Sequence, residues 1–215
     1  NGRAEGRLRL APTVRVIAGL DMQVTPLTLS FRGPPQGQSE GATPEPQISQ
    51  DPTEFATGDV VAYRPAAYVE TNVTMFDDWD LGIGVRADYY REIREWTVDP
   101  RLTTRLRFDE TNTTVRAGVG LFSQPPEFSE TAEGLGNPEL GPLRSIHVGL
   151  GADQRIPELN LSFSLDGFYK HIWDRVISTP GGRPPFFTNG GYGRIYGMEV
   201  GARIEPGGPL PVFGF

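Results

Sequence analysis

The stretch NGGYGRIYGMEVGARIEP, residues 189–206, decides the fold. After its glycine-rich start, polar Glu199 and Arg203 alternate with apolar Met198, Val200 and Ile204. A period of two residues predicts an extended strand with two unlike faces. In a soluble sheet the apolar face would cover a core, and in a membrane it would meet lipid. The pattern in the rest of the sequence decides between these two cases.

The same alternation recurs along the chain, and it predicts eight strands in an all-β, antiparallel meander. Their polar faces carry Arg, Asp, Glu, Ser and Gly, with little of the Lys and Gln that cover an ordinary solvated sheet. The predicted strands lie within 14–24, 67–75, 81–89, 101–108, 115–121, 146–153, 161–166 and 189–206. The apolar set expected to face outward is Val69, Val73, Ile83, Val85, Val119, Val148, Phe163 and Val200.

The connections between these strands alternate in length. Short ones are predicted at 77–80, 109–112, 156–160 and 205–209, and longer ones at about 32–59, 92–98, 124–142 and 175–189. Outer-membrane β-barrels have short turns on the periplasmic rim and longer extracellular loops. The pattern therefore favours a transmembrane barrel, with a soluble β-sandwich as the alternative.

Aromatic residues gather near both ends of the predicted strands, as two interfacial girdles require. Phe76 and Trp79 lie by the short turns. The set expected near the long loops is Tyr89, Tyr90, Trp96, Phe122, Tyr169 and Trp173.

Composition narrows the function. The 215 residues include 27 glycines and 20 prolines and carry a net charge of −7, which argues against nucleic acid as a partner. There is no cysteine, so disulfides and thiolate metal sites are excluded. The sequence has no run of 18 apolar residues, so no membrane-spanning helix is predicted. The strands of a membrane barrel would not produce such a run.

Several motifs, in order, resemble the C-terminal part of the barrel in TonB-dependent outer-membrane receptors. VRAGVGLFSQPPEF (115–128) precedes GNPELGPLRSIHVGLG (136–151), in which Leu143 stands where the family usually has Glu. The other similar stretches are LGIGVRADYY (81–90), LSFSLDGFYKHIWDRV (161–176) and residues 189–206.

The resemblance implies that residues 1–215 form about eight strands of a barrel of about 22, a fragment without the plug domain. It also implies an outer-membrane receptor, not an enzyme, that takes up a ferric siderophore, cobalamin or a glycan. The TonB energy-transducing complex would act through the missing plug, and no cofactor is expected. A structural or adhesion barrel, or a soluble β-sandwich binding module, remains the alternative.

A receptor of this kind needs ligand-binding groups at the outer mouth, where strands end and loops fold inward. Aromatic rings would cover the organic part of a chelate, and guanidinium groups would pair with its anionic oxygens. Asparagines beside Pro138 and Gly190 are equally consistent with a turn-shaping role. The predicted ligand-binding residues are Phe122, Gln124, Phe128, Asn137, Arg144, Asn189, Tyr192 and Arg194.

Other chemistry is less well supported. DDWD (77–80) has the carboxylates of a calcium site, but Asp at turn positions is more typical of a hairpin turn. His147 and His171 lie far apart in the sequence and lack further residues that could bind zinc with them. Asp166 with Glu199 or Asp88 resembles a glycosidase pair, yet a lumen wall carries such groups beside arginines. The acidic stretch 33–59 is a gate for a cationic ligand or, more simply, a solvated loop.

Overall fold

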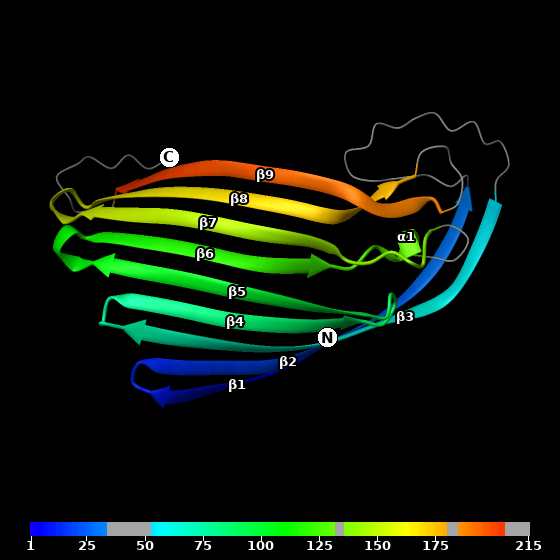
Figure 1. Cartoon of the computed structure of the whole chain (residues 1–215), viewed down its shortest axis with the longest axis horizontal. Coiled ribbons are helices and arrows are strands. Elements are labelled where there is room, and N and C mark those ends of the chain that lie inside the picture. The colour runs from blue at the N-terminus through cyan, green and yellow to red at the C-terminus, as the bar shows by residue number, and fades with distance from the viewer. Residues whose placement is uncertain (34–52, 132–135, 180–184, 205–215) are drawn as a thin grey trace.

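The computed structural model describes residues 1–33, 53–131, 136–179 and 185–204. Its strands form one antiparallel sheet in which each pairs with the next along the chain (Figure 1). The all-β meander is therefore confirmed, and the sheet has nine strands. They are β1 (Gly2–Ala11), β2 (Val14–Gly33), β3 (Thr53–Met75), β4 (Trp79–Tyr90), β5 (Glu95–Phe108), β6 (Thr113–Gln124), β7 (Leu143–Ile156), β8 (Leu161–Ser178) and β9 (Phe187–Ile204).

The first strand, β1, was not predicted. Its residues pair with β2 from Gly2 opposite Met22 to Ala11 opposite Val14. Arg3 and Arg7 do alternate with Ala4 and Leu8, but glycine and alanine make the apolar side of the pattern weak. Pairing with a strong neighbouring strand decides this segment, because β structure depends on cross-strand contacts more than on intrinsic preference.

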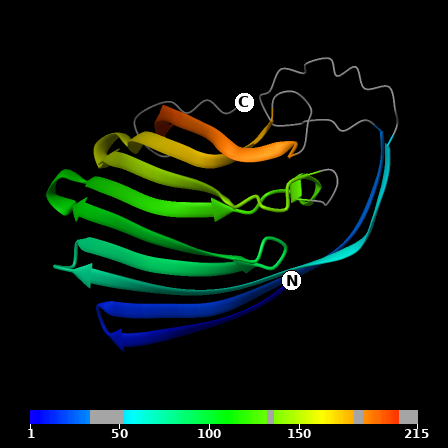
Figure 2. The same ribbon diagram turned by 45° about the vertical axis from the view of Figure 1, so that its right-hand side comes forward.

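Several strands extend beyond their predicted ends. β2 and β3 stay paired as far as Gly33 opposite Thr53, so residues 32–33 and 53–59 of the predicted 32–59 connection are strand. This pair continues as a two-stranded ribbon beyond the point where β4 joins β3 (Figure 2). β5 takes in 95–98, and β8 and β9 shorten the predicted 175–189 connection. Backbone pairing therefore extends beyond the residues whose side chains alternate. Residues 34–52 and the predicted turn at 205–209 lie outside the described residues.

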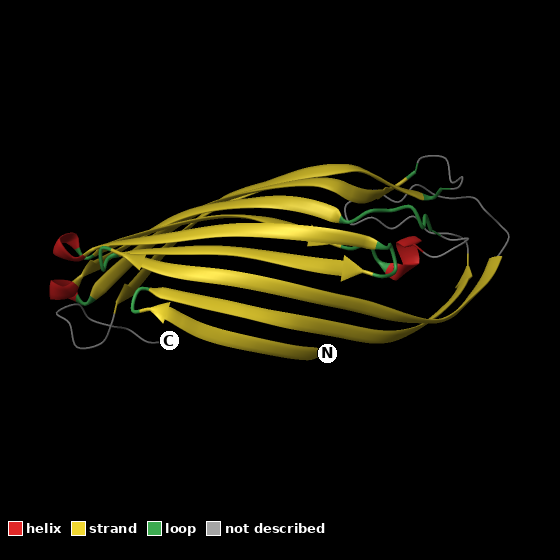
Figure 3. Ribbon diagram, turned by 60° about the horizontal axis from the view of Figure 1, so that its bottom comes forward, coloured by secondary structure: helices red, strands yellow, loops and turns green. Residues whose placement is uncertain are grey.

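The short turns lie together at one rim of the sheet, as predicted. Between β3 and β4, Phe76 and Asp77 have positive φ angles of 52° and 60°, the conformation that lets a tight hairpin follow the strand twist. Two other turns are short 3₁₀ helices, η1 (Asp109–Thr111) and η2 (Pro157–Leu159), each closed by a left-handed asparagine. Both lie at the rim opposite α1 (Phe128–Thr131), as Figure 3 shows.

The apolar face of the sheet is exposed. Val69 is 41% exposed, Val148 44% and Val200 72%, although all three would be core residues in a soluble sandwich. They lie on one surface, because the strand registers align apolar residues across the sheet. Val69 is opposite Val85, Val148 is opposite Val119, and Val200 is opposite Leu165. A single curved sheet with an uncovered apolar face fits a barrel wall in lipid and excludes the two-sheet sandwich.

Glycine on the polar face makes room for larger neighbours. A Cβ atom on Gly19 would lie 2.5 Å from the Tyr68 ring, and one on Gly197 would lie 2.6 Å from the ring of Phe168. These rings lie flat across the glycine of the adjacent strand. The packing of side chains within the wall therefore explains part of the glycine content of the polar face.

The aromatic prediction is wrong for two residues. Tyr89 and Trp96 face outward with ring centroids 5.0 Å apart. Tyr90 follows Tyr89 and therefore lies on the polar face, where it is buried. Phe122 also lies there, packed against His147. Only the outward rings can contribute to an interfacial girdle.

The buried apolar cluster of the described chain lies at the long-loop end. Leu140 packs there with Val176 of β8 and Phe187 of β9. Leu140 is 2% exposed. The cluster therefore fixes segment 136–142 against the ends of two strands.

Adjacent residues of β6 test the assignment of the faces. In the full-length barrel, Val119→Arg should lower the free energy of unfolding by about 2–4 kcal/mol if the site lies near the bilayer midplane. Gly118→Arg should cost less, because an added Cβ meets nothing nearer than 3.6 Å on the polar face. Denaturant unfolding in lipid vesicles measures both, and equal losses would contradict the assignment.

Cysteine labelling tests the orientation. This chain has no cysteine, so Ser129→Cys in α1 and Thr111→Cys in η1 each place one exposed thiol at opposite rims. Short turns face the periplasm in such barrels. A membrane-impermeant maleimide applied to intact cells should label position 129 and not position 111. Labelling of position 111 alone would reverse the topology.

Candidate functional site

Arg64 is the centre of the mouth at the long-loop rim. It lies on β3, with its guanidinium carbon 5.7 Å from the Tyr90 ring centre and 5.2 Å from that of Phe128. Tyr90 ends β4, whereas Phe128 begins α1 after Pro125 and Pro126 turn the chain. Guanidinium groups stack favourably on aromatic faces. Arg64 thus connects the wall to the segment that follows β6.

Glu92, in the turn between β4 and β5, pairs with the same guanidinium at 2.5 Å. The side chains of Arg64 and Glu92 are 19% and 7% exposed. The Oε2 atom of Glu92 is buried and has no hydrogen-bond partner among the described residues. Because a lone buried charge is costly, removing either partner should disturb the mouth more than losing a surface ion pair.

A groove of about 410 Å³ opens beside Arg64, and we call it the mouth groove. Two prolines and an aromatic ring give it an apolar wall, and an amide and a guanidinium supply hydrogen-bond donors. Such a mixture suits an organic ligand with polar edges. Its lining residues are Arg64, Gln124, Pro125, Pro126, Glu127, Phe128 and Ser129.

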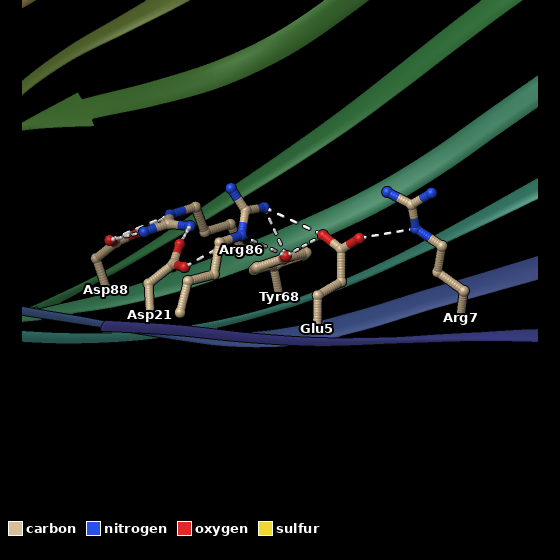
Figure 4. Close-up of polar contacts among 7 residues, drawn as sticks. Glu5, Arg7, Asp21, Tyr68, Arg86 and Asp88 are labelled. Carbon is tan, nitrogen blue, oxygen red and sulfur yellow. Dashed lines mark hydrogen bonds and ion pairs between the residues drawn. The ribbon is translucent and has the colours of Figure 1, made fainter. Parts of the chain in front are cut away.

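Tyr68 organises an ion-pair network on the polar wall below the mouth (Figure 4). Its hydroxyl donates to Glu5 at 2.5 Å and accepts from Arg3 at 2.6 Å. Arg86 binds Asp88 through two nitrogens, at 2.8 and 2.9 Å, and Asp21 at 2.6 Å. Each charge already has an opposite partner, so the network holds β1 to β4 in register.

A second hollow, of about 460 Å³, lies against this network. It shares Arg64 and Pro125 with the mouth groove. Arg86, Asp88 and Tyr90 also line it. Arg64 therefore lies between two hollows of different character, one against the proline segment and one against the charged wall.

The carboxylates considered as a glycosidase pair lie on the middle of the wall. Asp166 lies directly opposite Glu199, beside a hollow of about 580 Å³ with glycines in its floor. Asp166 is bound by Arg116 at 2.8 Å, and the same arginine pairs with Asp153 at 3.2 Å. This is the ion pairing that a lumen wall predicts.

The predicted ligand residues divide into three groups by their position in the structure. Gln124 and Phe128 meet in the mouth groove. Phe122 lies on the polar face with its ring 4.4 Å from that of His147. These three are placed where a ligand in the lumen mouth can reach them.

Two predicted residues hold the loop in place. Asn189 accepts from the Gly141 amide at 2.8 Å and donates to the carbonyls of Gly141 and Asp174. Asn137 donates to the Phe187 carbonyl at 2.9 Å. Their side chains are engaged with backbone, which favours the turn-shaping alternative for both.

The remaining three predicted residues are Arg144, which has an ion-pair partner, and Tyr192 and Arg194, which face outward. Arg144 pairs with Glu95 at 3.3 Å. Tyr192 and Arg194 share the outward face of β9 with Met198 and Val200, as the β8–β9 register requires. Strand parity alone places them on this face, although they stand in the glycine-rich start of residues 189–206.

Arg64, Tyr90 and Glu92 were missed as site residues. Arg64 precedes the predicted start of its strand at residue 67, and the intervening Pro65 obscured the alternation. Glu92 lies 28 residues from Arg64, so their contact depends on how the β3–β4 hairpin pairs. A lone arginine in phase with Tyr68 and Glu70 was the available signal.

Metal-binding clusters and membrane-spanning helices are both absent from the described part of the chain. No three His, Cys, Asp or Glu side chains come together there in a way that could hold a metal ion. No helix within it is long and apolar enough to span a membrane.

Comparison with known proteins gives the family. The model of the TonB-dependent receptor-like β-barrel matches residues 2–214, so the chain belongs to this family of outer-membrane receptors. No curated protein matches the sequence. The resemblance seen in the sequence and the outer-membrane location are thereby confirmed.

Solved structures agree on the fold. The siderophore receptor PirA from Pseudomonas aeruginosa matches with a TM-score of 0.68 and 17% identity, over 92% of this chain and 35% of its own. A variant of the ferric enterobactin receptor PfeA from the same organism matches with a TM-score of 0.71 and 15% identity, over 92% of this chain and 32% of its own. The FrpB iron transporter from Neisseria meningitidis matches with a TM-score of 0.69 and 16% identity, over 95% of this chain and 33% of its own. The chain thus spans about a third of the length of these receptors.

Glu130 gives the mouth a pH dependence. Burial raises the pKa of this carboxyl, although the Glu127 amide donates to it at 2.8 Å. A raised pKa in the folded state means that the α1 segment is most stable below the ordinary glutamate pKa and loses stability as the pH rises through the raised value. Hydrogen exchange of amides 127–131 in the full-length receptor, corrected for intrinsic rates, should therefore show less protection at pH 7 than at pH 4.

The Glu130→Gln variant is the control for this prediction. Its amide oxygen can still accept from the Glu127 amide, but it does not titrate. Protection of the α1 amides should therefore become independent of pH between 4 and 7. A wild-type protection that increases toward pH 7 would contradict the assignment.

Proposed function

We propose that this chain forms part of the wall and outer mouth of a receptor that takes up an anionic organic chelate, of the ferric siderophore class, across the outer membrane. Arg64 between Tyr90 and Phe128, beside the mouth groove, is the observation that carries the proposal. Cobalamin and glycans, which the family resemblance also allows, present fewer anionic groups to a guanidinium. The siderophore and iron receptors among the similar structures support the same choice.

Arg64 supplies the charge for this ligand. Its guanidinium can bind two oxygens of a carboxylate or catecholate in the fork geometry that arginine provides. Glu92 pairs with that charge at 2.5 Å. An incoming anion would compete with Glu92, whose unpartnered Oε2 makes its present environment incompletely satisfied.

The groove supplies the contact area. Phe128 and the two prolines offer apolar surface to the organic part of the chelate, while Gln124 offers an amide at its edge. Phe122, further down the polar face, extends this surface toward the lumen. Tyr192 and Arg194 have no part in this site because they face outward.

Transport itself needs parts of the receptor beyond this chain. A plug domain coupled to the TonB complex would release the ligand into the lumen, and no covalent chemistry is required of the wall. The ion-pair network around Tyr68 and Arg86 would give the ligand and plug a rigid, charged surface to move along.

Ligand binding by the full-length receptor tests the proposal. Arg64→Gln should weaken binding of ferric siderophores roughly tenfold to a hundredfold, because a hydrogen bond to a charged group contributes about 1.5–3 kcal/mol. Phe128→Ala should weaken binding through lost contact area. Arg15→Gln is the matched control, since Arg15 lies on the polar face beside the opposite rim and is exposed.

Affinity for a panel of ferric catecholate, hydroxamate and carboxylate siderophores would be measured, with the amount of barrel in the membrane as the folding control. Unchanged affinity of Arg64→Gln for every chelate, at normal barrel levels, would overturn the mouth groove as the site.

A further inference from the structure

The outward face of the last two strands changes character toward the long-loop rim. On β9 it is apolar or aromatic from Ile204 to Tyr196, and Arg194 follows. On β8 it is apolar or aromatic from Leu161 to Tyr169, with Gly167 between, and His171 follows. The two changes lie at the same level, because Tyr169 is opposite Tyr196 and His171 is opposite Arg194.

The length of this outward band matches a membrane. Residues 161–169 and 196–204 are each nine residues long. A transmembrane strand needs about 9–11 residues to cross the hydrocarbon core. The cross-strand pair of Tyr169 and Tyr196 therefore lies at the hydrocarbon boundary, and Arg194 lies beyond it, among the lipid headgroups.

Arg194 is available to an external ligand. It is exposed, and no carboxylate among the described residues pairs with it. Arg144, on β7, differs, because Glu95 neutralises it at 3.3 Å. Glu199 and the lumen carboxylates lie on the other face of the sheet.

Aromatic side chains lie at the positions next to Arg194 on the outward face. Tyr192, 78% exposed, lies on the same face two residues away. Across the strand pair, His171 is stacked on Trp173 with ring centroids 5.8 Å apart. Tryptophan and tyrosine prefer the headgroup level of a bilayer, so their rings would flank a headgroup bound at Arg194.

We propose that Arg194, flanked by Tyr192 and the His171–Trp173 pair, binds the phosphate of a lipid headgroup on the outer surface of the barrel. An exposed arginine suits this ligand because its planar fork matches two phosphate oxygens. The phosphate bears a negative charge, and the lipid chains continue along the apolar band below. The site depends on the outer-membrane location of the family and not on the identity of the transported ligand.

Lipid titration of the purified full-length receptor in detergent tests this site. The probe is short-chain phosphatidic acid, with phosphatidylcholine of the same chain length as the comparison, and native mass spectrometry measures bound lipid. We expect Arg194→Gln to bind phosphatidic acid roughly tenfold more weakly, as the loss of a charge-assisted contact predicts. Arg203→Gln, on the polar face of the same strand, should bind like the wild type.

A second variant separates charge from geometry. Arg194→Lys keeps the charge and lacks the fork, so its affinity should fall between those of the wild type and Arg194→Gln. Wild-type affinity in Arg194→Gln, or an equal loss in Arg203→Gln, would overturn the site. Inorganic phosphate that displaces the lipid at equal concentration would identify a free-phosphate site and overturn the headgroup proposal.

Siderophore binding by the same variants distinguishes this site from the mouth groove. Arg194→Gln should bind chelate normally, and Arg64→Gln should bind phosphatidic acid normally. Loss of phosphatidic acid binding in Arg64→Gln would show that the lipid effect arises from a general disturbance of the barrel and would overturn the assignment to Arg194.

Discussion

Continuous antiparallel pairing between long strands is the constraint on which the rest of this structure depends. In a bilayer an unpaired backbone group has no water to bind, so every membrane-spanning segment must pair along its whole length. In the described part of the chain, nine consecutive strands each pair with the next and are joined by tight turns at one rim. The outward apolar side chains and the inward ion pairs follow, because successive residues of a paired strand point to opposite faces.

The same constraint explains how the polar wall is built. Charged side chains on the inner face are neutralised by carboxylates of their own and nearby strands. Arg86 accordingly joins Asp21 and Asp88, and Arg116 joins Asp153 and Asp166. Tyr68 and Phe168 lie over glycines of the next strand. Small residues and ion pairs thus give a rigid wall. At the mouth, by contrast, one carboxylate oxygen of Glu92 is buried without a hydrogen-bond partner among the described residues.

The two proposed sites use the two faces at one rim. Inside, Arg64 is shared between aromatic rings and Glu92, so a ligand has to replace an existing partner. Outside, Arg194 has no carboxylate partner in the described chain and meets the headgroup layer. Arginine serves in both places because its guanidinium stacks on rings and binds oxyanions. The direction of the side chain, fixed by strand parity, decides which ligand each arginine can reach.

The sequence by itself determined the alternation, the short turns and the family, because these features depend on residues close together in the chain. Val148 and Gly149 point to opposite faces because they are consecutive residues of a strand, and the asparagines at 112 and 160 adopt the left-handed conformation that closes each turn. It also placed Gln124 and Phe128 at the mouth. Only the tertiary structure recruited β1, brought Arg64 to Glu92 and Phe128, and turned Tyr192 and Arg194 away from the lumen. These outcomes depend on register and on contacts between residues far apart in the chain, and a one-residue change of register would move each side chain to the other face.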